Sequence, residues 1–251
     1  VRLANSRSGE GFVAVSPESR KLFWLDRSRT AAIARHTNAF KINEDVVIPL
    51  ERMAEYTDGI ERINIELSLR NKLQLVESLS GILAGPLMMG RTHEAAAEGA
   101  SADDLLAERR ARALDLLSQV GARWRLLLAQ IDSPLQAMPQ SLEAVGLGSV
   151  NAALQARCAA EPSATLFHLL QDRTIRVSWK AELREPLREL FPGMAFAPVL
   201  EAVESAHRRV LRSRVFVALH MHAGDGNVHT NIPVNSDDYG MLKQAEEAVE
   251  R

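Results

Sequence analysis

The sequence predicts an α+β fold in which a small antiparallel sheet carries a large helical insertion. Alternating apolar and polar residues predict strands near the two ends of the chain, at 39–50, 214–222 and 227–234. Between them, residues 51–212 repeat apolar side chains at the three- and four-residue spacing of amphipathic helices. No glycine-rich phosphate loop follows a predicted strand, so the pattern does not indicate a doubly wound nucleotide-binding sheet.

Residues 1–50 are expected to supply the N-terminal part of the sheet. Residues 11–16 favour a short strand and residues 28–35 a short helix. In the stretch 39–50, apolar residues occupy alternate positions and a proline closes the run, which predicts a half-buried strand. These apolar residues are Phe40, Ile42, Val46 and Ile48.

Residues 51–212 are expected to form the helical insertion. A long helix follows residue 51, with Met53, Tyr56, Ile60, Ile63 and Leu67 on one face. Residues 90–101 predict a flexible connection, and Ser101 with Asp104 resembles a capping box that opens a second long helix reaching about residue 131. Further helices are predicted at 140–159, 164–172, 176–191 (broken by Pro186), 199–211 and 237–251.

Residues 213–251 combine a histidine-rich hairpin with the start of the C-terminal helix. Asp225-Gly226 tolerates the positive φ angles of a tight turn, so residues 214–222 and 227–234 should pair. Side chains in a strand alternate between its faces, which places His220 and His222 on one face of the first strand. His229 and Asn231 share a face of the second strand, and we expect the turn to bring His222 opposite His229.

Two imidazoles across a hairpin can share a divalent metal such as zinc or manganese. A complete site needs a third protein ligand, which His220 or a carboxylate from elsewhere would have to supply. The alternative is that these histidines are ordinary hairpin residues. Repeated placement on one face beside Gly-Asp-Gly favours the metal site.

Composition excludes several functional classes. The net charge is −2 and no basic block is present, which does not favour a nucleic-acid partner. The lone Cys158 excludes an internal disulfide and any cysteine-built metal centre, and is typical of a cytoplasmic protein. No apolar run is long enough to span a bilayer.

Two cations lie near the predicted sheet. Arg27 precedes the short helix and Lys41 lies in the strand 39–50. An arginine fork and a lysine point charge together suit the carboxylate of a small organic acid. Composition alone favours the alternative that both are solvated surface cations. Glu44 and Asp45 are equally suitable as their salt partners.

Two motifs in the chain resemble a known family. They are Phe-Lys-Ile-Asn-Glu-Asp-Val-Val-Ile-Pro at 40–49, preceded by Trp24-x-x-Arg27, and His-Ala-Gly-Asp-Gly-Asn-Val-His-x-Asn at 222–231. Both resemble the C-terminal substrate or cap domain of FAD-linked oxidases, in the group of D-lactate dehydrogenase, glycolate oxidase and D-2-hydroxyglutarate dehydrogenase. The resemblance implies a ferredoxin-like cap that works with an FAD-binding domain and oxidises a D-2-hydroxy acid to the 2-oxo acid.

The resemblance also implies roles for individual residues. His222 and His229 correspond to ligands of a divalent metal, and Asn231 faces the substrate. Arg27 and Lys41 correspond to cations that bind the substrate carboxylate, whereas the spacing of Thr30 is one residue short for a hydroxyl contact. The resemblance also implies that Asn227 lies on the cofactor side of the site.

The resemblance places other essential parts outside the chain. The FAD-binding domain is expected before residue 1, and a Glu-His-Gly segment with another metal ligand and the catalytic base is expected beyond Arg251. No catalytic residue is therefore assigned within the chain. As an isolated fragment it is expected to be inactive, to lack tight FAD binding and to bind metal weakly. The helical insertion resembles an enlarged cap found in some long bacterial proteins of this type.

Two alternatives from other functional classes remain open. In the first, His220, His222 and His229 form the whole site of a flavin-free metal-binding module. In the second, the amphipathic helices of residues 51–212 form a protein-interaction domain. The sequence does not distinguish among hydroxy acids, electron acceptors or oligomeric states.

Overall fold

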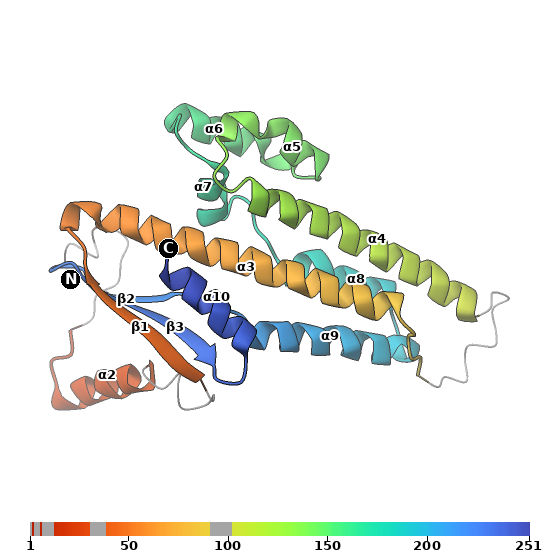
Figure 1. Ribbon diagram of the computed structural model, residues 1–251, viewed down its shortest axis with the longest axis horizontal. Helices are drawn as coiled ribbons and strands as arrows, with labels where there is room; N and C mark the ends of the chain where they lie inside the picture. Colours follow the sequence, from red (N-terminus) through yellow and green to blue (C-terminus); the bar gives the residue numbers. More distant parts are fainter. Residues whose placement is uncertain (1, 3–5, 7–12, 31–38, 91–101) are drawn as a thin grey trace.

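A three-stranded antiparallel sheet at one end of the molecule is joined to a long helical body (Figure 1). The computed structural model describes residues 2, 6, 13–30, 39–90 and 102–251, without the side chains of 26–30, 39–40 and 102–105. The described residues confirm the predicted α+β fold with a helical insertion. None of the helices found in them is long and apolar enough to cross a membrane.

The sheet has the strand order β1-β3-β2 and consists of the three strands predicted at its core. These are β1 (Ala39–Val47), β2 (Ala218–His222) and β3 (Asn227–Asn235). Along β3 every second side chain is buried: Val228, Thr230, Ile232 and Val234. This alternation is the pattern of a sheet with one covered and one open face.

The N-terminal region differs from the prediction. Residues 13–16 form no strand, and residues 11 and 12 lie outside the described part. Helix α2 (Pro17–Thr30) begins well before the predicted residue 28, and residues 31–35 are not described. The Ser16 hydroxyl accepts a hydrogen bond from the Ser19 amide at 3.1 Å, and Pro17 is pre-organised for the first helical position, so this start signal outweighs the short alternating run before it.

The helical body is built on two long helices that pack against each other, α3 (Met53–Ala84) and α4 (Ala102–Ala129). Ser101 and most of the predicted connection, residues 91–101, lie outside the described residues. The helix predicted at 176–191 begins only at residue 179. Pro186 does not break it, because a π-helical turn, Lys180–Arg184, accommodates the proline in the first turn of α8. The remaining helices are α5 (Pro139–Ala144), α6 (Asn151–Ala160), α7 (Leu166–Gln171), α8 (Glu185–Leu190), α9 (Ala197–Arg212) and α10 (Tyr239–Val249).

Helix α3 connects the sheet to the helical body. Its N-terminal half places Ile63 and Leu67 in a cluster with Ile232 and Val234 of the sheet and Met241 of α10. Its C-terminal half belongs to the larger helical cluster, in which Leu79, Leu83, Leu117 and Trp124 are fully buried. One rigid helix thus fixes the covered face of the sheet and leaves the opposite face free of α3 and α10. The division of the chain at 50/51 and 212/213 remains a prediction.

Candidate functional site

The face of the sheet opposite α3 and α10 carries every predicted site residue whose side chain the structure describes. Because side chains alternate along each strand, the register assigns them to rows that run across the three strands. The residues on this face are Lys41, Asn43, Asp45 and Val47 of β1, Asn227, His229, Asn231, Pro233 and Asn235 of β3, and Ala218, His220 and His222 of β2. We call this surface the open face.

The central row of the open face is Asp45–His229–His220. His229 of β3 lies between Asp45 of β1 and His220 of β2. The prediction that His222 lies opposite His229 is therefore wrong, since His222 pairs with Asn227. The turn occupies residues 223–226, closed by a hydrogen bond of 3.1 Å from the Asp225 amide to the His222 carbonyl, and this turn length fixes the register.

The three hairpin histidines nevertheless lie close together. The ring centroid of His222 is 5.6 Å from that of His220 and 5.7 Å from that of His229, and the His220 and His229 centroids are 6.1 Å apart. His220 and His222 are exposed, and His229 is half-buried. The sequence-based expectation that these imidazoles share one face is confirmed.

Asp45 orients the central histidine. Its carboxylate Oδ1 lies 2.7 Å from Nδ1 of His229. A carboxylate accepts, so the neutral ring carries its proton on Nδ1 and presents an unprotonated Nε2. A carboxylate behind an imidazole is the usual outer partner of a metal-binding histidine, since it fixes both tautomer and ring orientation.

The open face contains the donor types of a metal site but not a complete set. Within the residues that the structure describes, no three His, Cys, Asp or Glu side chains form a group able to hold a metal ion. Zinc requires nitrogen ligands at about 2.0–2.1 Å, so the rings would have to converge further. The described residues alone are therefore an incomplete site for the metal that the sequence suggested.

Gly226 connects the hairpin to the end of β1. Its φ of 75° lies in the left-handed region that favours glycine, and its carbonyl accepts a hydrogen bond of 2.9 Å from the Ile48 amide. A Cβ at this position would overlap the Ile48 carbonyl oxygen. Only glycine allows the turn to lie against the chain that leaves β1, which keeps Asp45 beside His229.

Lys41, one of the two predicted substrate-binding cations, does not lie beside the histidines. Lys41 pairs with Pro233, and the row Asn43–Asn231 separates it from the central row. Four residues along a strand correspond to roughly 13 Å, which is the backbone distance between Lys41 and Asp45. Arg27 and Thr30 lie in α2, and their side chains are outside the described part.

The sequence did not predict the contact between Asp45 and His229. It indicated Asp45 only as one of two acids able to pair with Arg27 or Lys41, whereas the structure describes His229 as its partner. The alternation of β1 contained a usable signal, since it assigns Asp45 to the same face as Lys41 and assigns Glu44 to the other. What the sequence lacked was the register between β1 and β3, which depends on the close contact at Gly226.

Comparison with known proteins identifies one similarity. Residues 196–251 match the family of FAD linked oxidases, C-terminal domain. The match covers α9, the histidine hairpin and α10, and it supports the resemblance at the level of FAD-linked oxidases for this part of the chain. It does not reach α2 or β1, where Arg27, Lys41 and Asp45 lie. No curated protein and no solved structure matches the chain.

Proposed function

We propose that the open face is the substrate-facing surface of a flavin-linked oxidoreductase. The observation that carries this proposal is the row Asp45–His229–His220, with His222 beside it, inside the segment that is similar to FAD-linked oxidases. Polar, accessible side chains gathered on one side of a sheet with an apolar opposite face form a surface suited to a second domain and a small ligand. The flavin would be bound by an FAD-binding domain, as the sequence resemblance implies.

The substrate class we propose is a small D-2-hydroxy acid such as D-lactate or glycolate. Lys41 and Arg27 provide positive charge for its carboxylate, and Asn231, in the row between Lys41 and the histidines, provides hydrogen bonds. Asn227, beside His222, is proposed to face the cofactor. His222 and His229 contribute two of the ligands of a divalent metal, and a further ligand comes from outside the described residues. The bound metal would polarise the hydroxyl group of the substrate.

The direct test is oxidation in a polypeptide that joins this chain to an FAD-binding domain. Addition of D-lactate or glycolate is expected to bleach the visible absorbance of the oxidised flavin. H229A should abolish this bleaching, and K41M should raise KM with a smaller effect on kcat, since uniform substrate binding is lost. Bleaching that is unchanged in H229A and K41M would contradict the proposal.

A second candidate function is a flavin-free metal-binding module, favoured by the position of His220 directly opposite His229. Zinc titration of the chain by calorimetry separates the two candidates. The oxidoreductase predicts weak binding that depends on His222 and His229 and is insensitive to H220A. The module predicts tight binding that H220A abolishes.

A further inference from the structure

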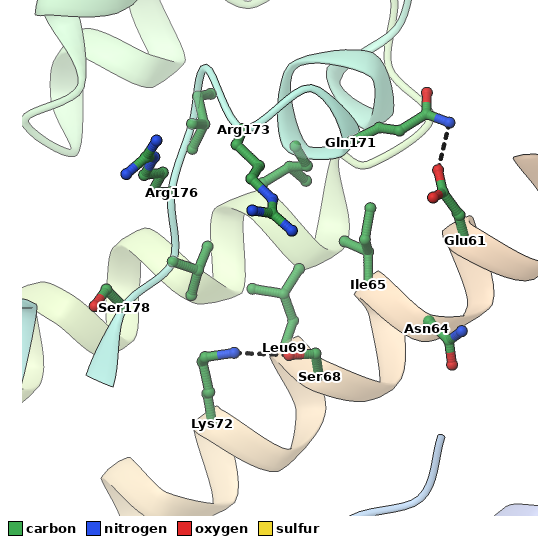
Figure 2. A pocket seen from close by; sticks show the side chains of 13 residues that line it. Glu61, Asn64, Ile65, Ser68, Leu69, Lys72, Gln171, Arg173, Arg176 and Ser178 are labelled. Atoms are coloured by element: carbon green, nitrogen blue, oxygen red, sulfur yellow. Dashed lines mark hydrogen bonds between the residues drawn. The ribbon is translucent and has the colours of Figure 1, made fainter. Parts of the chain in front are cut away.

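A cleft in the helical body, with no histidine in its lining, has the features of an anion site. It has a volume of about 560 Å³ and lies between α3 and the segment 170–178, which comprises the end of α7 and the residues after it (Figure 2). This volume is in the range of small-molecule sites. Its lining combines apolar side chains with three cations and two hydroxyls: Ile65, Leu69, Ile175 and Val177 with Lys72, Arg173, Arg176, Ser68 and Ser178.

Within the part of the chain that the structure describes, the cations of the cleft lack carboxylate partners. Among the acidic side chains that the structure describes, none forms an ion pair with Lys72, Arg173 or Arg176. Some arginines of the helical body do have carboxylate partners, as Arg184 has in Glu204 at 2.6 Å. The lining of this cleft contains three cations and one carboxylate, Glu61, so its net charge is positive.

Lys72 is the least exposed of these cations: it is half-buried, whereas Arg173 and Arg176 are exposed. Its Nζ donates a hydrogen bond of 2.6 Å to the Ser68 hydroxyl, one helical turn away. Burial lowers the pKa of Lys72, nearby Arg214 lowers it further, and only Glu182 opposes these effects. Glu182 is already bound by Arg123 at 2.8 Å, so it does not neutralise the ammonium. A partly buried ammonium without a counter-charge is unfavourable, and a bound anion would relieve this cost.

Arg173 is held in a backbone conformation that does not suit arginine. Its φ is 63°, in the left-handed region, at the position after the C-cap of α7 where glycine is preferred. Figure 2 shows its side chain extending from the loop toward α3, on the side of the helix that carries Leu69 and Lys72. Arg176 lies at the rim and points away from the centre of the cleft.

The acidic residue of the cleft lies at the opposite end. Glu61 accepts a hydrogen bond of 2.6 Å from Nε2 of Gln171, as Figure 2 also shows. Eleven residues of helix separate Glu61 from Lys72, or about 16 Å along the α3 axis. The negative charge of Glu61 therefore leaves the end formed by Lys72, Ser68 and Arg173 available to an anion.

We propose that this cleft binds a phosphate group of a small molecule. The guanidinium of Arg173 offers a planar fork to the phosphate oxygens, Lys72 a point charge and Ser68 a hydroxyl. The apolar lining formed by Ile65, Leu69 and Ile175 accepts the body of the ligand. This site is independent of the open face and of the function proposed for it.

The test is calorimetric titration of the whole chain with inorganic phosphate and with a sugar phosphate, at low ionic strength. We expect saturable binding of the sugar phosphate, weakened at least about tenfold in K72Q and in R173G, which corresponds to about 1.4 kcal/mol. Glycine suits the left-handed backbone at this position. Without ligand, the midpoint temperature of thermal unfolding should therefore be at least as high in R173G as in the wild type. K243Q removes an exposed charge from α10 and should bind like the wild type.

Three outcomes would overturn the proposal. The first is the absence of saturable binding of either probe up to about 10 mM. The second is equal affinity in R173G, K243Q and the wild type, which would indicate diffuse attraction to surface charge. The third is equally tight binding of the dephosphorylated sugar.

Discussion

Arg251 donates two hydrogen bonds to the carboxylate of Glu66, which lies 185 positions earlier in the chain. The bond to Oε1 is 3.0 Å and the bond to Oε2 is 2.7 Å, a bidentate arrangement. Arg62 and Arg70 also donate to Glu66, at 3.1 and 2.7 Å. A nearly buried carboxylate of α3 therefore joins the residues after α10 to the helix that supports the sheet.

Replacing Glu66 should destabilise the fold. Its side chain is only 8% exposed, so E66Q leaves polar groups imperfectly paired and is expected to reduce the free energy of unfolding by about 1–3 kcal/mol. The matched control is E55Q, which removes the exposed pair of Glu55 with Arg52 and should cost much less than E66Q. Urea unfolding measures both, and equal losses in the two variants would argue against the network.

The Glu66 carboxylate should also make the stability of the fold depend on pH in the acid range. The Arg251 guanidinium, assisted by Arg70 and Arg62 and opposed by burial, lowers the pKa of Glu66 below its ordinary value of 4.5. A lowered folded-state pKa means that Glu66 contributes stability above about pH 4.5, which is lost as the pH falls through the folded-state value. The difference in unfolding free energy between the wild type and E66Q should therefore be constant near neutral pH and shrink in acid. A difference that grows in acid would contradict this assignment.

Two glycines of the hairpin turn should respond differently to alanine. G226A imposes a left-handed φ on a residue with Cβ and overlaps the Ile48 carbonyl, so we expect a loss of about 2 kcal/mol or more. At Gly224 no atom lies within 4 Å of an added Cβ and φ is not positive, so G224A should be nearly neutral. Thermal unfolding tests stability, and amide exchange of β3 tests the hairpin directly. Equal behaviour of the two variants would show that the turn can move away from β1.

Local sequence patterns were sufficient for the strands and for most helices, because each pattern acts within a few residues. The alternation of β3 and the apolar stripe of α3 predicted both elements with small errors at their ends. The register between the strands could not be predicted from such local patterns. Whether His222 or His220 lies opposite His229 depends on a four-residue turn, and the pairing of Asp45 with His229 depends on contact between segments 184 positions apart. Such long-range geometry leaves no periodic trace in one sequence.

His207 should make stability depend on pH near neutrality. Its ring stacks on Trp179 with centroids 4.6 Å apart, and burial is the main cause that lowers its pKa below the ordinary value of 6.5. The folded state therefore favours the neutral ring, and its contribution is present above pH 6.5 and lost as the pH falls toward the folded-state value. In H207F an aromatic ring can still stack on Trp179, but the side chain no longer binds a proton. Unfolding between about pH 8 and pH 5 should show a smaller loss of stability for H207F than for the wild type, and an equal loss would contradict the prediction.

The carboxylate behind His229 provides the sharpest test of the open face, because its neighbour in sequence is a natural control. Asp45 and Glu44 are adjacent acids of β1 with exposed side chains, but only Asp45 shares the face of His229 and contacts its Nδ1. If His229 binds a divalent metal through Nε2, D45N should weaken zinc or manganese binding about 10–100-fold, since the outer carboxylate sets the tautomer and basicity of the ring. E44Q removes the same charge from the opposite face and should leave the affinity nearly unchanged. Equal losses in D45N and E44Q would indicate general electrostatic attraction and would remove Asp45 from the site.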